Sequence, residues 1–190
     1  MRIVRATAAL AAAVSCFSVA GAAVETRVIR VGVESEAIGP WHVDANPSLA
    51  AAIRAFGSPS SCETVKGLPG FASVEWRQLG LLGVFGSYGI PGGRACQLRR
   101  AVVLDNARAS GQAWRTGKGL RVGDSVAKLH RLYPNASLRG YRRDIPPIRG
   151  WWLVVRTGFV PERFQFPALL ATARGGRVTG LVVTVGAEGD

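Results

Sequence analysis

The sequence predicts an α+β fold of two similar halves, each a short helix packed on a small antiparallel sheet. A weak internal repeat with an offset of 77 residues aligns residues 46–57 with residues 123–134. Both segments have the apolar spacing of an amphipathic helix, and both precede stretches rich in aromatic and β-branched residues. Antiparallel strands leave one face open, which a helix can cover.

The two predicted helices begin and end at recognisable signals. Their apolar residues recur at helical spacing, namely Leu49, Ala52, Ile53 and Phe56 in the first and Val126, Leu129, His130 and Tyr133 in the second. Asn46 with Pro47 marks the start of the first helix, and Asp124 or Ser125 that of the second. Gly57-Ser58-Pro59 ends the first helix, and Pro134-Asn135 ends the second.

Strands are predicted after each helix. The first half has candidates at residues 74–76, 79–85 and 101–104, and the second at 151–156, 166–173 and 178–185. Gly175-Gly176 predicts a hairpin over residues 168–185. The chain therefore divides into an N-terminal strand or linker (24–37), a first half (38–108) and a second half (109–190). A helix followed by a hairpin is common, so a chance likeness of the halves stays open.

Residues 1–23 have the pattern of a cleavable secretory signal peptide. Arg2 and Arg5 precede an apolar run over residues 6–20, and small residues follow it. The run is shorter than the roughly 20 residues that a membrane-spanning helix needs. We therefore expect a secreted or extracytoplasmic protein, in the cell envelope or outside it, with no transmembrane segment after cleavage. Lipidation of Cys16 is the alternative, although Ala13-Val14-Ser15 before it lacks the usual leucine.

The charge balance is strongly basic. The chain has 24 Lys and Arg against 12 Asp and Glu, a net charge of +12, and nearly all the basic residues are arginine. Arginine suits phosphate and carboxylate ligands, although a genome rich in G and C gives the same bias. Only Arg99-Arg100 and Arg142-Arg143 are adjacent pairs, so no nucleic-acid-binding tract is present.

Two cysteines remain after the predicted leader, Cys62 and Cys96. An even number of cysteines in an oxidising compartment favours a disulfide between them. A zinc site would need more ligands, and the two histidines, His42 and His130, are isolated in the sequence. We therefore expect neither a metal nor a cofactor.

The repeated pattern resembles a known family. A short helix that ends in an aromatic-Gly/Pro turn and precedes a small sheet, in tandem, is similar to the β-lactamase-inhibitor-protein fold and to the small lipoprotein of the outer-membrane assembly machinery (the BamE/SmpA type). Residues 119–125 with Leu129 and Tyr133-Pro134, and their counterparts in residues 48–59, carry this resemblance. The segment also resembles an uncharacterised group of secreted actinobacterial-type proteins. The resemblance implies a non-enzymatic binder.

Enzyme signatures are weak. Ser125-Val126-Ala127-Lys128 matches the S-x-x-K pattern of serine β-lactamases, but the chain is too short for that domain. A helix cap and a solvated helix face explain the same residues. His42 close to Asp44 and the isolated His130 lack an evident nucleophile or orienting group. We expect no catalytic residue.

The segment 141–152 is the predicted binding surface. Its candidate residues are Tyr141, Arg142, Arg143, Trp151 and Trp152, beside a rigid Pro146-Pro147 corner. Aromatic residues and arginine are enriched at binding hot spots, although a tryptophan here could equally pack in the core.

We therefore expect a secreted, non-enzymatic binding or inhibitory protein. Its partner would be an extracytoplasmic protein or an anionic envelope polymer, held on a sheet face or on the 141–152 segment. The alternatives are a hydrolase of the cell envelope and a structural envelope protein without a discrete ligand.

Overall fold

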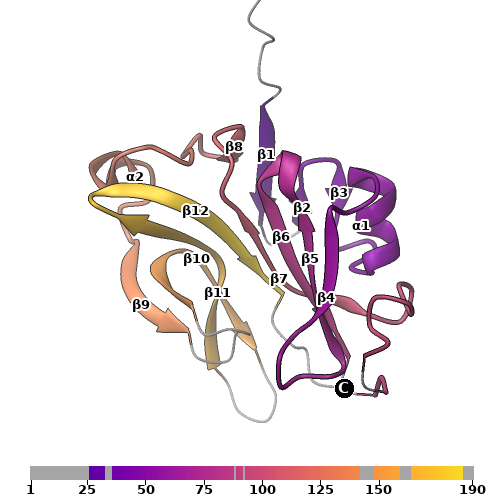
Figure 1. Ribbon diagram of the computed structural model, residues 1–190. Coiled ribbons are helices and arrows are strands. Elements are labelled where there is room, and N and C mark those ends of the chain that lie inside the picture. The colour runs from indigo at the N-terminus through magenta and orange to yellow at the C-terminus, as the bar shows by residue number, and fades with distance from the viewer. Residues whose placement is uncertain are drawn as a thin grey trace, which may run out of the picture.

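The computed structural model describes residues 26–32, 36–87, 89–91, 93–141, 148–158 and 164–185. The predicted signal peptide over residues 1–23, with Cys16, lies outside this part of the chain. The described residues form twelve strands, two α-helices and one 3-10 turn, labelled in chain order in Figure 1.

Eight strands form one antiparallel sheet in the order β4-β5-β6-β7-β12-β11-β10-β9. Their bounds are β4 (Ser61–Thr64), β5 (Phe71–Trp76), β6 (Leu81–Gly86), β7 (Val103–Ala109), β9 (Ser137–Tyr141), β10 (Ile148–Gly158), β11 (Phe164–Arg174) and β12 (Arg177–Thr184). Figure 1 shows β4, β5 and β6 on the right and β9 to β12 on the left.

A smaller sheet of four strands has the order β3-β2-β1-β8. It consists of β1 (Arg27–Val31), β2 (Glu36–Ile38), β3 (Trp41–His42) and β8 (Trp114–Thr116). β1 and β8 pair in parallel, and the other neighbours are antiparallel. Ile29, Ile38 and Trp41 from this sheet belong to the same apolar core as the inward residues of the larger sheet, so the two sheets pack against each other.

The predicted fold class is wrong. We expected two halves, each a short helix on its own small sheet, but β7 pairs with β12 from Leu181↔Ala109 to Thr184↔Asn106 and joins all eight strands. The four-stranded sheet was not foreseen either. Each helix does precede four consecutive strands of the large sheet, yet the molecule is mostly β, because the helices have only eight and seven residues.

Both helices contribute apolar residues to the core and begin at a serine cap. The hydroxyl of Ser48 accepts a hydrogen bond from the backbone N–H of Ala51 (3.2 Å) at the start of α1 (Leu49–Phe56). Ser125 accepts one from Lys128 (3.2 Å) in the same way at the start of α2 (Val126–Leu132). Asn46, predicted as the first cap, instead accepts a hydrogen bond from the Ser48 hydroxyl (2.6 Å). Neither these helices nor any other described segment forms a helix long and apolar enough to cross a membrane.

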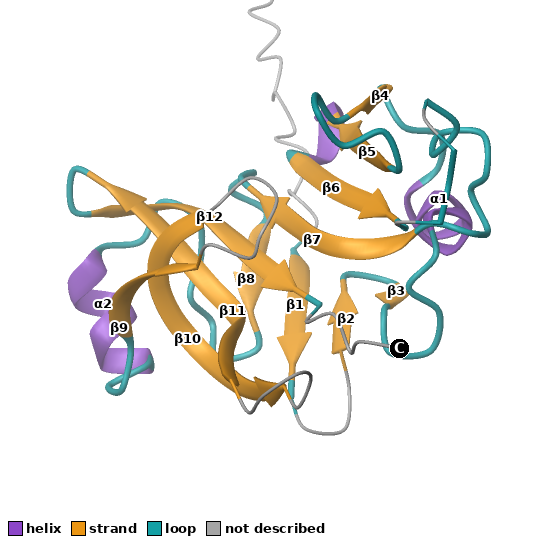
Figure 2. Cartoon of the chain, turned by 90° about the horizontal axis from the view of Figure 1, so that it is seen from below, coloured by secondary structure: helices purple, strands orange, loops and turns teal. Residues whose placement is uncertain are grey.

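The hairpin predicted over residues 168–185 is confirmed. β11 and β12 are joined by Gly175 and Gly176, whose φ angles of 57° and 74° suit glycine and few other residues. Register shifts along β10 and β11 mark bulges, and Figure 2 shows both strands bent strongly. The part of the large sheet that contains β10 and β11 is therefore curved rather than flat.

Three buried tryptophans connect the loops to the core. The indole N–H of Trp41 donates to the backbone carbonyl of Asn46 (2.8 Å), that of Trp76 to Gly57 (2.9 Å), and that of Trp114 to Leu79 (2.6 Å). Leu79 ends the 3-10 turn η1 (Arg77–Leu79). The ring of Phe56 packs edge-on against all three tryptophans. The aromatic cluster thus holds the small sheet, the end of α1 and η1 together.

One ion pair joins the two sheets. A carboxylate oxygen of Glu36 on β2, a side chain only 5% exposed, lies 2.8 Å from the guanidinium of Arg156 on β10. Arg156 also donates to the carbonyl of Gly32 (2.6 Å). The second oxygen of Glu36 has no hydrogen-bond partner in the described part of the chain. Burial raises the pKa of Glu36 and Asp44 acts in the same direction, and together they outweigh the opposing effect of Arg156.

The predicted disulfide is present. Cys62 on β4 is bonded to Cys96, and their Cα atoms are 6.0 Å apart. Both cysteines are partly buried against the core. The bond connects the edge of the large sheet to the segment between β6 and β7.

We expect Cys62→Ala/Cys96→Ala to lower the free energy of unfolding by about 3–4 kcal/mol, because the closed loop limits the unfolded chain. Urea denaturation measures this change, and reduction of the wild type should give a similar loss. Equal stability of the double variant and the oxidised wild type would contradict the expectation.

We expect Glu36→Gln to change how stability depends on pH. Since folding raises the pKa of Glu36 above its ordinary value of 4.5, its contribution to stability is complete below that value and is lost as pH rises through the raised one. The free energy of unfolding of the wild type minus that of the variant, from urea denaturation, should therefore decrease from acid to neutral pH. Glu63 on β4 is exposed, so Glu63→Gln is the control for loss of one surface carboxylate. A difference that grows with pH would overturn this assignment.

Candidate binding face

A row of directly paired residues runs across all eight strands of the large sheet. In strand order it consists of Ser61, Glu75, Leu82, Arg108, Val182, Leu170, Trp152 and Ser137. Residues directly opposite each other in a sheet point to the same face. We call this set the cross-sheet row.

The cross-sheet row faces away from the core. The neighbouring row is buried within the core, as shown by Trp76, Leu81, Ala109, Leu181 and Ala171. Successive residues of a strand point to opposite faces, so the cross-sheet row lies on the opposite side of the sheet from the helices and the small sheet. We call this side the outer face.

One half of the row is buried. Trp152, Leu170 and Val182 form a separate apolar cluster on the outer face, and Trp152 is only 7% exposed. The guanidinium of Arg139 on β9 lies 5.3 Å from the centre of the Trp152 ring.

The other half of the row is open. Leu82 is 39% exposed and is paired with Arg108, which is also exposed. Gly180 makes room for the arginine, because a Cβ at that position would lie 3.0 Å from Arg108 Nε. Among the described residues no carboxylate forms an ion pair with Arg108. Glu75, the carboxylate of the cross-sheet row, pairs with Arg77 instead (3.3 Å).

Three of the four large apolar side chains found exposed in the described part lie on the outer face, whereas Leu138 pairs with Trp151 and points to the inner face. The large apolar residues found exposed in the described part are Leu82, Val103, Leu138 and Val155. Val103 pairs with Gly86, and Gly86 pairs with Phe71. Phe71 is on the same side of β5 as Glu75 of the cross-sheet row, so Val103 lies on the outer face. Val155 follows the core residue Val154 and therefore points outward. An exposed leucine beside an arginine that has no carboxylate partner among the described residues suits a protein partner better than a small molecule.

Of the residues predicted as a binding surface, the two tryptophans lie on opposite faces of β10. Trp152 belongs to the cross-sheet row, whereas Trp151 packs against the core and contacts the ring of His130, with ring centres 4.6 Å apart. Tyr141 ends β9, where it pairs with Ile148, and Arg142 and Arg143 lie outside the described residues. Partner binding by these five residues stays a prediction.

Sequence reasoning missed Leu82 and Arg108. The predicted strand stopped at Leu104, although β7 runs to Ala109. The alternation Ala107-Arg108-Ala109 is the signal that could have placed an outward arginine on a strand.

The candidate catalytic residues already have structural roles. Ser125 caps α2, and the ammonium of Lys128 lies 2.8 Å from Asp124. His130 contacts Trp151, and His42 is exposed on β3. No hydrogen bond or ion pair joins either imidazole to a carboxylate within the described part.

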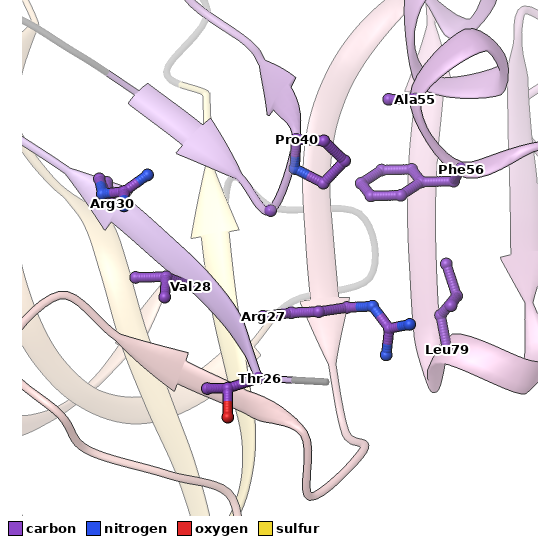
Figure 3. Close-up of a pocket in the computed structure, with 9 residues that line it drawn as sticks. Thr26, Arg27, Val28, Arg30, Pro40, Ala55, Phe56 and Leu79 are labelled. Carbon is purple, nitrogen blue, oxygen red and sulfur yellow. The ribbon is translucent and has the colours of Figure 1, made fainter. Parts of the chain in front are cut away.

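A cavity of about 520 Å³ lies between the start of β1 and the end of α1. Figure 3 shows the side chain of Arg27 extending from β1 toward Leu79, with Phe56 nearby. The polar side chains that line it are Thr26, Arg27 and Arg30. The described residues of this lining could hold an anion, and none of them is an acid or an imidazole that could transfer a proton.

The described residues contain no group of three or more His, Cys, Asp or Glu side chains arranged to hold a metal ion. No protein-family model, curated protein or solved structure matches this chain. The candidate binding face therefore depends on the geometry of the chain itself.

Proposed function

We propose that this protein is exported and acts as a non-enzymatic binding or inhibitory protein, which holds a partner protein on the outer face of its large sheet. The exposed pair of Leu82 and Arg108 carries the proposal. The pair lies near the middle of a continuous sheet, and Arg108 has no carboxylate partner among the described residues.

The physical reason is the composition of this surface. Binding hot spots combine an arginine with apolar neighbours near the centre of an interface, where the surrounding contacts exclude water. Leu82, directly paired with Arg108, supplies exposed apolar area beside it. A carboxylate of the partner would meet a guanidinium that forms no ion pair with any described residue of its own chain.

Two sequence observations support the biological setting. The leader pattern over residues 1–23 favours export, and the Cys62–Cys96 disulfide suits an oxidising compartment. The resemblance of the repeated helix segments to the β-lactamase-inhibitor-protein family favours binding over catalysis.

Site-specific photocrosslinking tests the proposal. A photoreactive residue at position 82 should give one dominant adduct with an extracytoplasmic protein of the native host. Excess wild-type protein should compete for it, whereas Arg108→Glu should compete at least about 30-fold less well, because loss of a hot-spot side chain costs about 2 kcal/mol.

Position 54 provides the matched control, because Arg54 is an exposed arginine on α1, on the core side of the sheet. A photoreactive residue there should not give the dominant adduct, and Arg54→Glu should compete like the wild type. Equal competition by Arg108→Glu and Arg54→Glu would refute the proposed face.

A further inference from the structure

Two pairs of arginines face each other across paired backbone segments. Arg115 on β8 is bridged to Arg121, and Arg174 is paired with Arg177 at the tip of the β11–β12 hairpin. Directly opposed residues have Cα atoms about 4.5–5.5 Å apart, and like charges in this position are destabilising. Each pair thus concentrates positive charge at a cost to folding.

The two pairs belong to one surface region. The backbone N–H of Gly123 donates to Val178 (2.8 Å), and that of Val178 donates to Asp124 (2.8 Å). The guanidinium of Arg177 donates to the carbonyl of Gly123 (3.0 Å), two residues after Arg121. In Figure 1 the hairpin tip lies beside α2 and the loop that leads into it.

The nearby carboxylate, Asp124, attracts Arg121 but forms its ion pair with Lys128. One oxygen of Asp124 lies 2.8 Å from the Lys128 ammonium and accepts a hydrogen bond from the backbone N–H of Arg121 (2.7 Å). In the described part of the chain, none of the four guanidinium groups forms an ion pair. Arg121, Arg174 and Arg177 are exposed and Arg115 is half-buried.

We propose that Arg115, Arg121, Arg174 and Arg177 bind a soluble polyanion that carries closely spaced phosphate groups. A guanidinium donates two parallel hydrogen bonds to phosphate oxygens, and two facing arginines need two negative charges within a few ångströms. Successive phosphates of a condensed phosphate chain supply that charge density. The second arginine pair extends the site along the chain.

A lipid surface fits this region less well. Proteins that bind at a bilayer interface insert exposed tryptophan, phenylalanine or leucine. The exposed large apolar residues of the described part are Leu82, Val103, Leu138 and Val155, and none of them lies in residues 115–131 or 174–177. The region offers charge without an apolar anchor.

Fluorescence anisotropy with labelled linear polyphosphate tests the proposal. Arg121→Gln/Arg174→Gln removes one arginine from each pair, and neither side chain forms an ion pair among the described residues. We expect about tenfold weaker binding and a shallower dependence of log Kd on log salt, by about 0.7–0.9 for each lost phosphate contact. The thermal midpoint should not fall, because two like-charge pairs are relieved.

Arg54→Gln/Arg100→Gln is the control with equal loss of charge, since both arginines are exposed outside this region. It should weaken binding less than about twofold, as expected of a change in net charge without loss of a contact. If the first double variant does not fold, Arg174→Gln alone, on the exposed hairpin, is the test.

Three results would overturn the proposal: equal weakening by both double variants, equally tight binding of polyglutamate of the same charge, or tighter binding to anionic vesicles than to polyphosphate. The proposal is independent of the outer-face function. Arg108→Glu should bind polyphosphate within about twofold of the wild type even if no partner protein is found.

Discussion

The pairing of β7 with β12 determines the architecture. These two strands are separated by more than sixty residues of chain, yet four residue pairs join them in the middle of the large sheet. Without this contact the strands that follow α1 and those that follow α2 would form two sheets, and β7 and β12 would become two additional edges. Unpaired edges expose hydrogen-bonding groups and invite association with other chains. The pairing of β7 with β12 removes these two edges and makes one continuous sheet of eight strands.

The candidate binding face is a direct result of that pairing. Arg108 on β7 and Val182 on β12 are partners in it, so the cross-sheet row connects the exposed Leu82 side to the buried Trp152 side only because the strands meet there. The core beneath is held by three indole hydrogen bonds and by the Glu36–Arg156 pair. Burial on the inner face fixes the register, and the register then fixes which side chains reach the outer face.

Local patterns in the sequence predicted the local elements. The helices at residues 46–57 and 123–134, the Gly175-Gly176 hairpin and the disulfide follow from spacing, turn chemistry and cysteine count, and all are present. The merging of the strands depended on a contact between distant segments, which no local pattern encodes. β4 and β9 escaped prediction because edge strands such as Ser61–Thr64 bury few residues and lack apolar alternation. The pairing of Trp152 with Leu170, and hence the cross-sheet row, likewise required knowledge of the register.

The disulfide has a consequence for the effect of proteolysis. It encloses β5 and β6, which carry Glu75 and Leu82 of the cross-sheet row, and the exposed turn at Lys66-Gly67 lies within the closed loop. Proteases cut most readily at such turns. A single cut there would leave the two fragments covalently attached through Cys62 and Cys96, while sheet hydrogen bonds keep β5 and β6 in register. A nicked molecule of this kind could retain an intact outer face after an encounter that would split an unbridged chain.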